Sequence, residues 1–519
     1  MSVRRPAREQ IADLGRRLHF GLSADEVDEF VVMVDEALAA HDWLEDRGER
    51  ARGPAEREGG AHPSAEENPL GAWYWRTRIS ETSDGPLSGK TVVVKDNVCV
   101  AGTPMMNGSV VLEGYVPEFD ATVVRRVLDA GGTIVGKAVC ESLCYSGASH
   151  TSDSGPVRNP YDPSRSSGGS SSGCGALLAS GEVDLAIGGD QGGSIRCPSS
   201  WSGVYGLKPT YGLVPYTGAF PLEMTIDHLG PMARTTADVA LLLDVLAGPD
   251  GQDPRQNWSE TVGISPDASS YSEALGQGIE GLRVGILGEG FGWAGVSEPD
   301  VDEAVRSAAR CFASLGANVS EISVPWHRDG GKITIGIACE GATSLLLHGE
   351  GMGTGWKGLY SESMMEALAL GRRRHGSRLS PTLKLHALAG QWMHDTYHGR
   401  FYAKAQNASR LLRQAYDDAL TAVDVLVLPT TPIKATPIPP PGISVSESAR
   451  IAHQMGANTS PFNAAGHPAM SVPCAMSEGL PVGMMIVGPR GNDATVLCAA
   501  HAFETHVFRA PPPRSVHDG

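Results

Sequence analysis

Apolar residues recur at three- and four-residue intervals through the first 46 positions of the chain. They are Ile11, Leu14, Leu18, Val27, Phe30, Val31, Val34 and Leu38. This spacing puts them on one side of a helix, so we predict a pair of amphipathic helices over residues 7–46. Residues 47–70 are rich in Glu, Arg, Gly, Pro and Ala, which is typical of an exposed linker. The first 65 residues are therefore predicted to form an N-terminal helical extension.

The pattern changes after residue 88. Residues 91–94 form a short apolar run that ends at Lys95, and residues 133–136 form another. Between them, residues 121–130 have helical spacing, and Gly131-Gly132 ends the predicted helix. A strand, a helix and a second strand at this spacing indicate an α/β layer structure.

The second half of the chain shows the same two patterns. We expect strands at 281–287, 423–429 and 480–488, and a helix at 299–315. Residues 340–425 are mostly helical in pattern, which suggests an inserted helical cap over 326–425. The catalytic core is then predicted to consist of residues 66–325 and 426–519.

Charge and composition exclude some classes of binding partner. The net charge of −17 argues against a nucleic-acid or anionic-membrane partner. No run approaches the ~18 apolar residues of a membrane span, and the N-terminus lacks a signal peptide's apolar stretch. The nine cysteines are odd in number and contain no CxxC pair, which favours free thiols over a zinc site. We therefore expect a cytoplasmic protein.

The most unusual segment, residues 165–218, is crowded with glycine and hydroxyl side chains. A strand at 185–187 leads into Gly188-Gly189-Asp190-Gln191-Gly192-Gly193-Ser194. Glycines in such a turn let successive backbone N–H groups point into one concavity. A serine at its end would have an oxyanion hole ready for acyl transfer. The alternative is a purely structural glycine-rich turn.

A nucleophilic serine also needs a base. His228 lies next to Asp227, and His467 precedes Pro468, so either histidine could complete a triad. Lys95 is the other candidate, because its stem leaves an apolar strand and desolvation favours the neutral form of lysine. A strand-end lysine can equally reach out to water. The residues alone leave these alternatives open.

Three local motif matches carry little weight. Residues 169–173 fit GxSxG, but no hydrophobic strand precedes them as a nucleophile elbow requires. Residues 131–137 resemble a phosphate-binding loop, yet Ala138 stands where a magnesium-binding hydroxyl is needed. Residues 288–293 lack the last glycine of GxGxxG.

In combination, the motifs resemble the amidase signature family. They are residues 94–97, 168–173, 188–196, 206–210, 463–468 and 480–483, and the resemblance runs from about residue 70 to 505. It implies a mixed central β-sheet flanked by helices. It also implies that Ser194 is the acyl-enzyme nucleophile, that Ser170 follows a cis peptide bond and bridges to the lysine, and that Lys95 is the base. Neither a metal nor an organic cofactor is implied.

The resemblance also suggests the remaining site residues. The backbone N–H groups of Gln191, Gly192, Gly193 and Ser194 match the oxyanion hole. Residues 189–194, 212–220 and 228–231 are similar to those of actinobacterial amidases paired with nitrile hydratases. This implies hydrolysis of aliphatic and aromatic amides, and dimerisation through the helical extension. Substrate contacts are then expected from Gln191, Tyr145, Ile226 and Trp326.

The sequence departs from the family pattern at Ser172, which is usually glycine, and at residues 197–201 beside the nucleophile. The same mechanism would serve carbamates, anilides, hydrazides or esters. A glutamine-hydrolysing amidotransferase subunit is a rival function. A non-catalytic binding protein is a further one, against which the intact Lys95, Ser170 and Ser194 argue.

Overall fold

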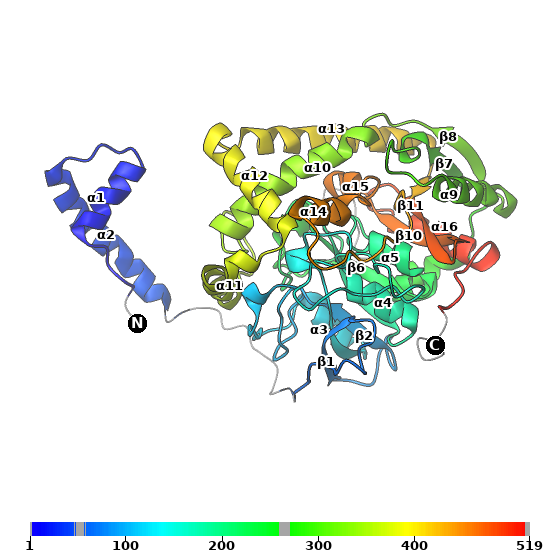
Figure 1. Cartoon of the computed structure of the whole chain (residues 1–519), viewed down its shortest axis with the longest axis horizontal. Coiled ribbons are helices and arrows are strands. Elements are labelled where there is room, and N and C mark those ends of the chain that lie inside the picture. Colours follow the sequence, from blue (N-terminus) through cyan, green and yellow to red (C-terminus); the bar gives the residue numbers. More distant parts are fainter. Residues whose placement is uncertain (1–2, 46, 48–56, 58, 259–269, 514–519) are drawn as a thin grey trace. The chain divides into compact units, whose positions relative to one another are not determined.

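The computed structural model describes residues 3–45, 47, 57, 59–258 and 270–513. The chain divides into two compact units, Met1–Gly53 and Pro54–Gly519 (Figure 1). Residues 48–56 and 58, which belong to the predicted linker over residues 47–70, lie outside the described residues.

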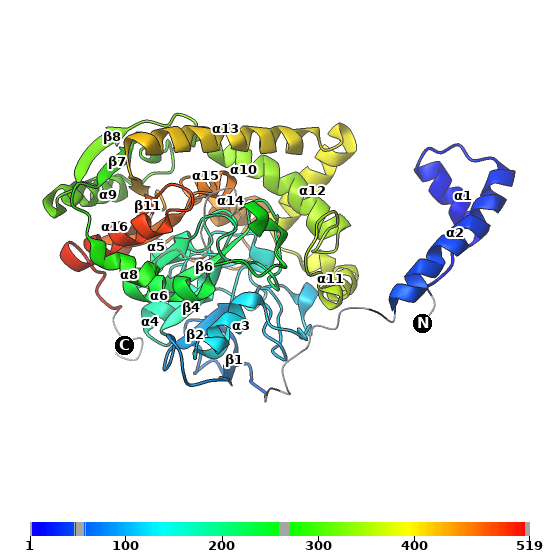
Figure 2. The same cartoon turned by 180° about the vertical axis from the view of Figure 1, so that it is seen from behind.

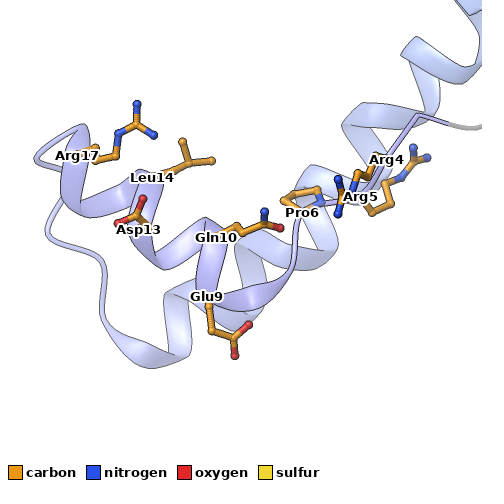
Figure 3. Close-up of a pocket in the computed structure, with 8 residues that line it drawn as sticks. All are labelled: Arg4, Arg5, Pro6, Glu9, Gln10, Asp13, Leu14 and Arg17. Atoms are coloured by element: carbon orange, nitrogen blue, oxygen red, sulfur yellow. The ribbon is translucent and has the colours of Figure 1, made fainter. Parts of the chain in front are cut away.

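The first unit is a helical pair, as predicted for residues 7–46. Helices α1 (Arg8–Arg17) and α2 (Ala24–Glu45) pack against each other, and Arg5 forms an ion pair with Asp42 at 2.6 Å. A hollow on this unit is lined by six polar side chains and by Pro6 and Leu14, all from the start of the chain and from α1 (Figure 3). Several large apolar side chains of α2 remain exposed. They are Phe30, Val32, Met33, Trp43 and Leu44.

The second unit is built on one sheet of eleven strands. Its order is β1-β3-β2-β4-β6-β5-β10-β11-β9-β7-β8. The strands are β1 (Trp73–Ile79), β2 (Thr91–Lys95), β3 (Thr133–Ala138), β4 (Leu185–Asp190), β5 (Tyr205–Lys208), β6 (His228–Ala233), β7 (Arg283–Leu287), β8 (Asn318–Ile322), β9 (Val425–Pro429), β10 (Ala469–Ser477) and β11 (Leu480–Val487). Strand β2 runs parallel to β3 and β4, and β7 runs parallel to β8 and β9, whereas the other pairs are antiparallel. The sheet is therefore mixed, as expected.

Helices cover both faces of this sheet. The described helices of the unit are α3 (Thr122–Asp129), α4 (Ser172–Ser180), α5 (Arg196–Ser202), α6 (Thr236–Leu246), α8 (Tyr271–Ala274), α9 (Pro299–Cys311), α10 (His327–Ala342), α11 (Glu362–His375), α12 (Pro381–Tyr397), α13 (Arg400–Ala422), α14 (Val445–His453), α15 (Ser460–Ala465) and α16 (Asp493–His506), and all but α10–α13 belong to the layers beside the sheet. Alternate strand residues point to opposite faces. On β2, Val92 and Val94 join the core that includes Val127 of α3, whereas Val93 joins the core that includes Leu177 of α4.

Four helices stand apart from these two layers. Within the Pro54–Gly519 unit, α10, α12 and α13 are grouped together with α11 near by (Figure 1 and Figure 2). Helix α10 packs directly on α12, α13 and α15. Helical structure thus covers most of residues 340–425, as predicted, but it begins earlier, at His327. Sheet strands lie on both sides of this helical segment in the sequence.

Other local predictions can be compared with the structure. The short apolar runs at 91–94, 133–136, 281–287, 423–429 and 480–488 lie on β2, β3, β7, β9 and β11. Residues 133–138 are therefore a strand and not a phosphate-binding loop. The GxSxG segment enters α4 from a loop, so it has no nucleophile elbow. Within the described residues, no helix has both the length and the apolar character needed to cross a membrane. All nine cysteines lie in the described part and are free.

Candidate active site

The sheet topology brings Lys95 and the glycine-rich turn together. Strands β2 and β4 are parallel neighbours, with Val94 opposite Ile187. The carboxyl ends of parallel strands meet at one edge of a sheet, where ligands bind in α/β folds. Lys95 is the last residue of β2, and the turn that carries Ser194 follows the last residue of β4. Two segments nearly 100 residues apart in sequence therefore share one site.

Lys95 contacts Ser170 directly. Its Nζ donates to Ser170 Oγ at 2.8 Å and to the carbonyl oxygen of Gly189 at 3.0 Å, and both side chains are buried. The peptide bond between Gly169 and Ser170 is cis, the geometry that the family resemblance implies for this serine. The next residue, Ser171, donates its N–H to the carbonyl oxygen of Ser194 at 3.1 Å. Lys95, Ser170 and Ser194 are thus gathered in one place.

Two buried acidic residues hold this region in position, one through its carboxyl group and the other through its backbone. Asp96 accepts hydrogen bonds from the N–H groups of Met106 and Asn107 and forms a buried ion pair with Lys137 at 3.0 Å. Glu141 donates its N–H to the Ser170 carbonyl oxygen at 3.2 Å. Burial raises the pKa of Glu141 to about 7, against hydrogen bonds from Thr151 that favour the charged form.

The glycine-rich turn is fixed from inside by Asp190. Its Oδ1 accepts from the N–H of Gly193 at 2.7 Å, and its Oδ2 accepts from the N–H of Ile195 at 3.0 Å. The Gly193 N–H therefore does not join an oxyanion hole, because the carboxylate already occupies it. Among the described residues, none accepts a hydrogen bond from the N–H of Gln191, Gly192 or Ser194. These three donors remain available.

Asp190 belongs to a fully buried ionic cluster. Arg196 donates to it through Nε and Nη2, both at 3.0 Å, and Asn463 donates through Nδ2 at 2.9 Å. Burial opposes the charge on Asp190, but attraction to Arg196 and these hydrogen bonds outweigh it. They hold the pKa of Asp190 well below its usual value. The carboxylate is therefore a permanent anchor for the turn.

Ser194 opens into a cavity of about 530 Å³. The floor is the glycine-rich turn, and the walls come from residues 144–147, from α10 and α12, and from residues 452–460. Its apolar lining includes Leu222, Ile226, Ala338, Leu385, Ala389 and Met455. No Asp, Glu, Lys or Arg is found among the described residues that line it. The cavity thus offers no charged side chain to a bound molecule.

Three of the four predicted substrate contacts line this cavity. They are Gln191, Tyr145 and Ile226. Gln191 donates through Nε2 to Tyr216 Oη at 3.0 Å, which leaves its buried Oε1 without a partner. The buried hydroxyl of Tyr145 also has no partner among the described residues. Two residues of the wall therefore each have a buried polar atom without a partner among the described residues.

Trp326 does not line the cavity, so its expected substrate contact is not found. It is the residue before α10, and 39% of its surface is exposed. Helix α10 first reaches the cavity at Gly331 and lines it through Thr334, Ile335 and Ala338. A residue more than one helical turn earlier points elsewhere, which the sequence spacing could not reveal.

Neither candidate histidine base lies at Ser194. His228 is buried beside Lys208, with its Nε2 at 3.3 Å from Lys208 Nζ. His467 bonds through Nε2 to Asp417 at 3.0 Å. Both are absent from the cavity lining. The geometry therefore favours Lys95 as the base near the nucleophile.

Sequence reasoning missed several residues of the site. His386 on α12 and His453 at the end of α14 line the cavity, as does Cys144. No local motif marks them, because each is an isolated polar residue in an ordinary segment. The unusual segment 197–201 lies in α5, where Cys197 forms part of the cavity wall. Trp201 is buried behind it and donates to the Ile433 carbonyl oxygen at 3.0 Å.

Comparison with known proteins identifies the family. The sequence model of the family described as Amidase matches residues 64–497. The enantioselective amidase of Rhodococcus rhodochrous is 46% identical over 515 residues, which cover 99% of this chain and 98% of that protein. A glutamyl-tRNA(Gln) amidotransferase subunit of Methanosarcina acetivorans is 37% identical over 442 residues, which cover 83% of this chain and 88% of that protein.

Solved structures give the same result. A glutamyl-tRNA(Gln) amidotransferase subunit of Thermotoga maritima has a TM-score of 0.70 at 29% identity, covering 86% of this chain and 91% of that chain. The native peptide amidase of Stenotrophomonas maltophilia has a TM-score of 0.66 at 28% identity, covering 83% and 85%. With a family match over most of its length and a relative that spans nearly all of it, the chain belongs to the amidase signature family of hydrolases.

Proposed function

We propose that this chain hydrolyses linear carboxylic acid amides, aliphatic and aromatic, to the acid and ammonia through an acyl-enzyme on Ser194. The observation that supports this most is the 2.8 Å contact between the buried Lys95 Nζ and Ser170 Oγ. The residue after Ser170 bonds the backbone of Ser194, which lines the cavity. Ser194 supplies a nucleophile, and the Ser170–Lys95 pair supplies the route by which its proton leaves.

Acylation begins when Ser194 Oγ attacks the substrate carbonyl carbon. Its proton passes to Ser170 Oγ, while the Ser170 proton passes to Nζ of neutral Lys95. When the C–N bond breaks, the relay runs backwards, and Ser170 gives a proton to the departing nitrogen. Ammonia leaves, and a water molecule then attacks the acyl-enzyme ester with the same relay as its base.

The free N–H groups of Gln191, Gly192 and Ser194 stabilise the negative oxygen that forms during each attack. Donors fixed before the reaction are worth more than solvent, because they need no reorganisation as charge develops. Asp190 holds the turn in this orientation through Gly193 and Ile195. The unpartnered Oε1 of Gln191 is placed to accept a hydrogen bond from the substrate's amide nitrogen.

The lining of the cavity favours uncharged acyl groups. Burying an isolated charge without a partner is unfavourable by several kcal/mol. Glutamine carries both an ammonium and a carboxylate group, and the described lining offers neither a counter-charge. We therefore favour amide hydrolysis over the rival function of a glutamine-hydrolysing amidotransferase subunit. The α10–α13 segment, which supplies one wall, acts in this proposal as the substrate cap.

Carbamates, anilides, hydrazides and esters are the second group of substrates, since the same relay would serve them. The test is a panel of these compounds and simple amides with the purified full-length chain. We expect ammonia release from benzamide and propionamide without ATP or a partner protein. Higher kcat/KM on an aryl carbamate than on every amide would change the substrate class and keep the relay.

The relay itself is tested with a fluorophosphonate probe and two variants. Ser194→Ala should abolish both labelling and turnover. Lys95→Met should abolish turnover while its cavity keeps its shape. Ser200→Ala is the matched control, because Ser200 is a buried serine on α5 that bonds Thr431 and does not line the cavity. Undiminished labelling of Ser194→Ala would identify another nucleophile.

We also propose that the chain forms a homodimer through its N-terminal unit. Large exposed apolar patches on a protein usually mark a site of contact with another protein. Helix α2 exposes five large apolar residues. Light scattering on the full-length chain should give twice the monomer mass, and Met33→Glu should reduce it. A monomer at micromolar concentration in the unaltered chain would contradict the proposal.

A further inference from the structure

We propose that His386 and His453 form a subsite in the cavity that recognises a hydroxyl group on the acyl part of the substrate. This inference rests on the proposed amide hydrolysis at Ser194 and adds a substrate class to it. It predicts a preference for hydroxyl-bearing aromatic amides over their unsubstituted counterparts.

Three rings in succession form this part of the cavity wall. The ring centroids of Tyr145 and His386 are 5.4 Å apart, and those of His386 and His453 are 5.1 Å apart. The rings come from the loop after β3, from α12 and from the last turn of α14, and α12 packs on α14. All three residues line the cavity that contains Ser194. An acyl group on Ser194 therefore shares one space with both imidazoles.

The protonation of His386 follows from its contact with the helix backbone. Its Nδ1 lies 2.9 Å from the carbonyl oxygen of Thr382, one turn earlier on α12. A carbonyl oxygen can only accept, so Nδ1 carries the proton. Burial lowers the pKa of His386, which keeps the ring neutral. Its Nε2 is then an acceptor, and no described residue donates to it.

His453 supplies the complementary group. Part of its side chain is open to solvent, and its ring nitrogens have no hydrogen-bond partner among the described residues. Burial of the ring and the neighbouring His386 lower the pKa of His453 to about 4, so the imidazole is neutral near pH 7. A neutral imidazole always carries one N–H, and nothing in the described part of the chain ties that N–H to another group. The pair therefore presents one acceptor and one donor side by side. A hydroxyl matches both, because it donates its hydrogen and accepts with its oxygen.

The two imidazoles share the lining with other uncharged polar side chains, which are Ser146, Thr334, Gln454 and Ser460. Thr334 already donates to the carbonyl oxygens of Gly330 and Ser460, and Gln454 already accepts from Arg450. The described lining is otherwise apolar or uncharged, and Gln191 stands in the turn that carries Ser194. The volume of about 530 Å³ falls in the range of pockets that hold ligands larger than a simple amide. An aromatic acyl group fits such a space, and a ring hydroxyl can reach the wall.

The experiment compares kcat/KM for benzamide, 3-hydroxybenzamide, 4-hydroxybenzamide and 4-methoxybenzamide. It uses the full-length chain and the variants His386→Phe, His386→Gln and His453→Phe. Phenylalanine keeps a ring beside Tyr145 but removes the acceptor, whereas glutamine keeps an acceptor. The matched control is His348→Phe, since His348 bonds Gln391 and does not line the cavity.

We expect the better hydroxybenzamide to exceed benzamide by roughly three- to tenfold in kcat/KM, as one net hydrogen bond gives. His386→Phe should bring that ratio close to one, because it removes the acceptor that only the hydroxyl compounds use. His386→Gln should keep part of the preference, and His348→Phe all of it. The methoxy compound should gain little, because it has no hydrogen to donate to Nε2.

Two kinds of failure can be told apart. If the unaltered chain hydrolyses no amide, the proposed function is wrong. If it hydrolyses benzamide but shows no hydroxyl preference, or if His386→Phe lowers all four substrates equally, the amidase proposal stands and the histidine subsite is wrong.

Discussion

Replacing Asp190 by asparagine tests whether this residue, which anchors the turn that carries Ser194, is needed for stability and for turnover. Asp190 touches no substrate in the proposed mechanism, yet its carboxylate receives five hydrogen bonds of 2.7–3.0 Å, from Gly193, Ile195, Arg196 and Asn463. An asparagine side chain keeps one oxygen but turns an N–H₂ group toward at least two of these donors. It also leaves the Arg196 guanidinium buried without its counter-ion.

The magnitude follows from these contacts. Removing one partner of a buried ion pair typically costs about 3–5 kcal/mol. Unfolding a chain of this length changes the entropy by roughly 1 kcal/mol per kelvin near 60 °C, so the Tm should fall by about 3–5 °C. Displacing the N–H groups of the turn should also lower kcat by at least about 100-fold, as the loss of one oxyanion donor does.

The assay combines thermal unfolding with benzamide turnover for Asp190→Asn, Arg196→Met and the double variant. The double variant has no unpaired charge, so it should recover part of the lost stability without recovering kcat. Asp329→Asn is the control, because Asp329 forms an exposed pair with Lys332. An Asp190→Asn variant no less stable than this control, or a double variant less stable than both single ones combined, would refute the reasoning.

Three further predictions concern other positions. Burial raises the pKa of Glu141 to about 7, so its stabilising contribution is complete below about pH 4.5 and is lost as the pH rises through 7. Relative to Glu141→Gln, the unaltered chain should lose roughly 3 kcal/mol between pH 4.5 and 7.5, and parallel pH–stability curves would contradict this. Gly193→Ala places a Cβ 2.3 Å from Thr459 Oγ1 at a backbone φ of 139°, so this variant should lose its turnover. Gly276→Ala is the control, because the added Cβ meets open space there, and its turnover should be unchanged. Equal activity of the two variants would rule out the clash at Gly193. Trp326→Ala should change kcat/KM for benzamide by less than twofold relative to the unaltered chain, because Trp326 is partly exposed and does not line the cavity. A larger loss would show that Trp326 contacts the substrate.

The strands that could be predicted are those whose own residues are continuously apolar. Residues 91–94 and 425–429 read as buried strands because each lies deep in the sheet with neighbours on both sides. Strand β6 escaped prediction, since its His228, Gly230 and Pro231 have low strand propensity and are held there by pairing with β4. Strand β5 also lies in the middle of the sheet, and its glycine and buried lysine hid it from prediction in the same way.

The catalytic candidates were accessible from sequence because each sits in a local motif. Lys95 ends an apolar strand, and Ser170 and Ser194 lie in glycine-rich turns whose backbone demands small residues. The sequence could not show which backbone N–H groups of the turn have acceptors within the protein. Only the folded turn shows that Gly193 gives its N–H to Asp190, whereas the N–H groups of Gln191, Gly192 and Ser194 have no acceptor among the described residues.

By itself, the sequence determined the family, the α/β class and the three residues proposed for catalysis, because those features depend on short contiguous patterns. Tertiary structure alone decided what surrounds the substrate. His386 and His453 lie 67 positions apart and meet only because α12 packs on α14, and Trp326 falls outside the cavity because α10 turns it away. Helical periodicity fixes which residues share a face, but the packing partner of that face is set by contacts between distant segments.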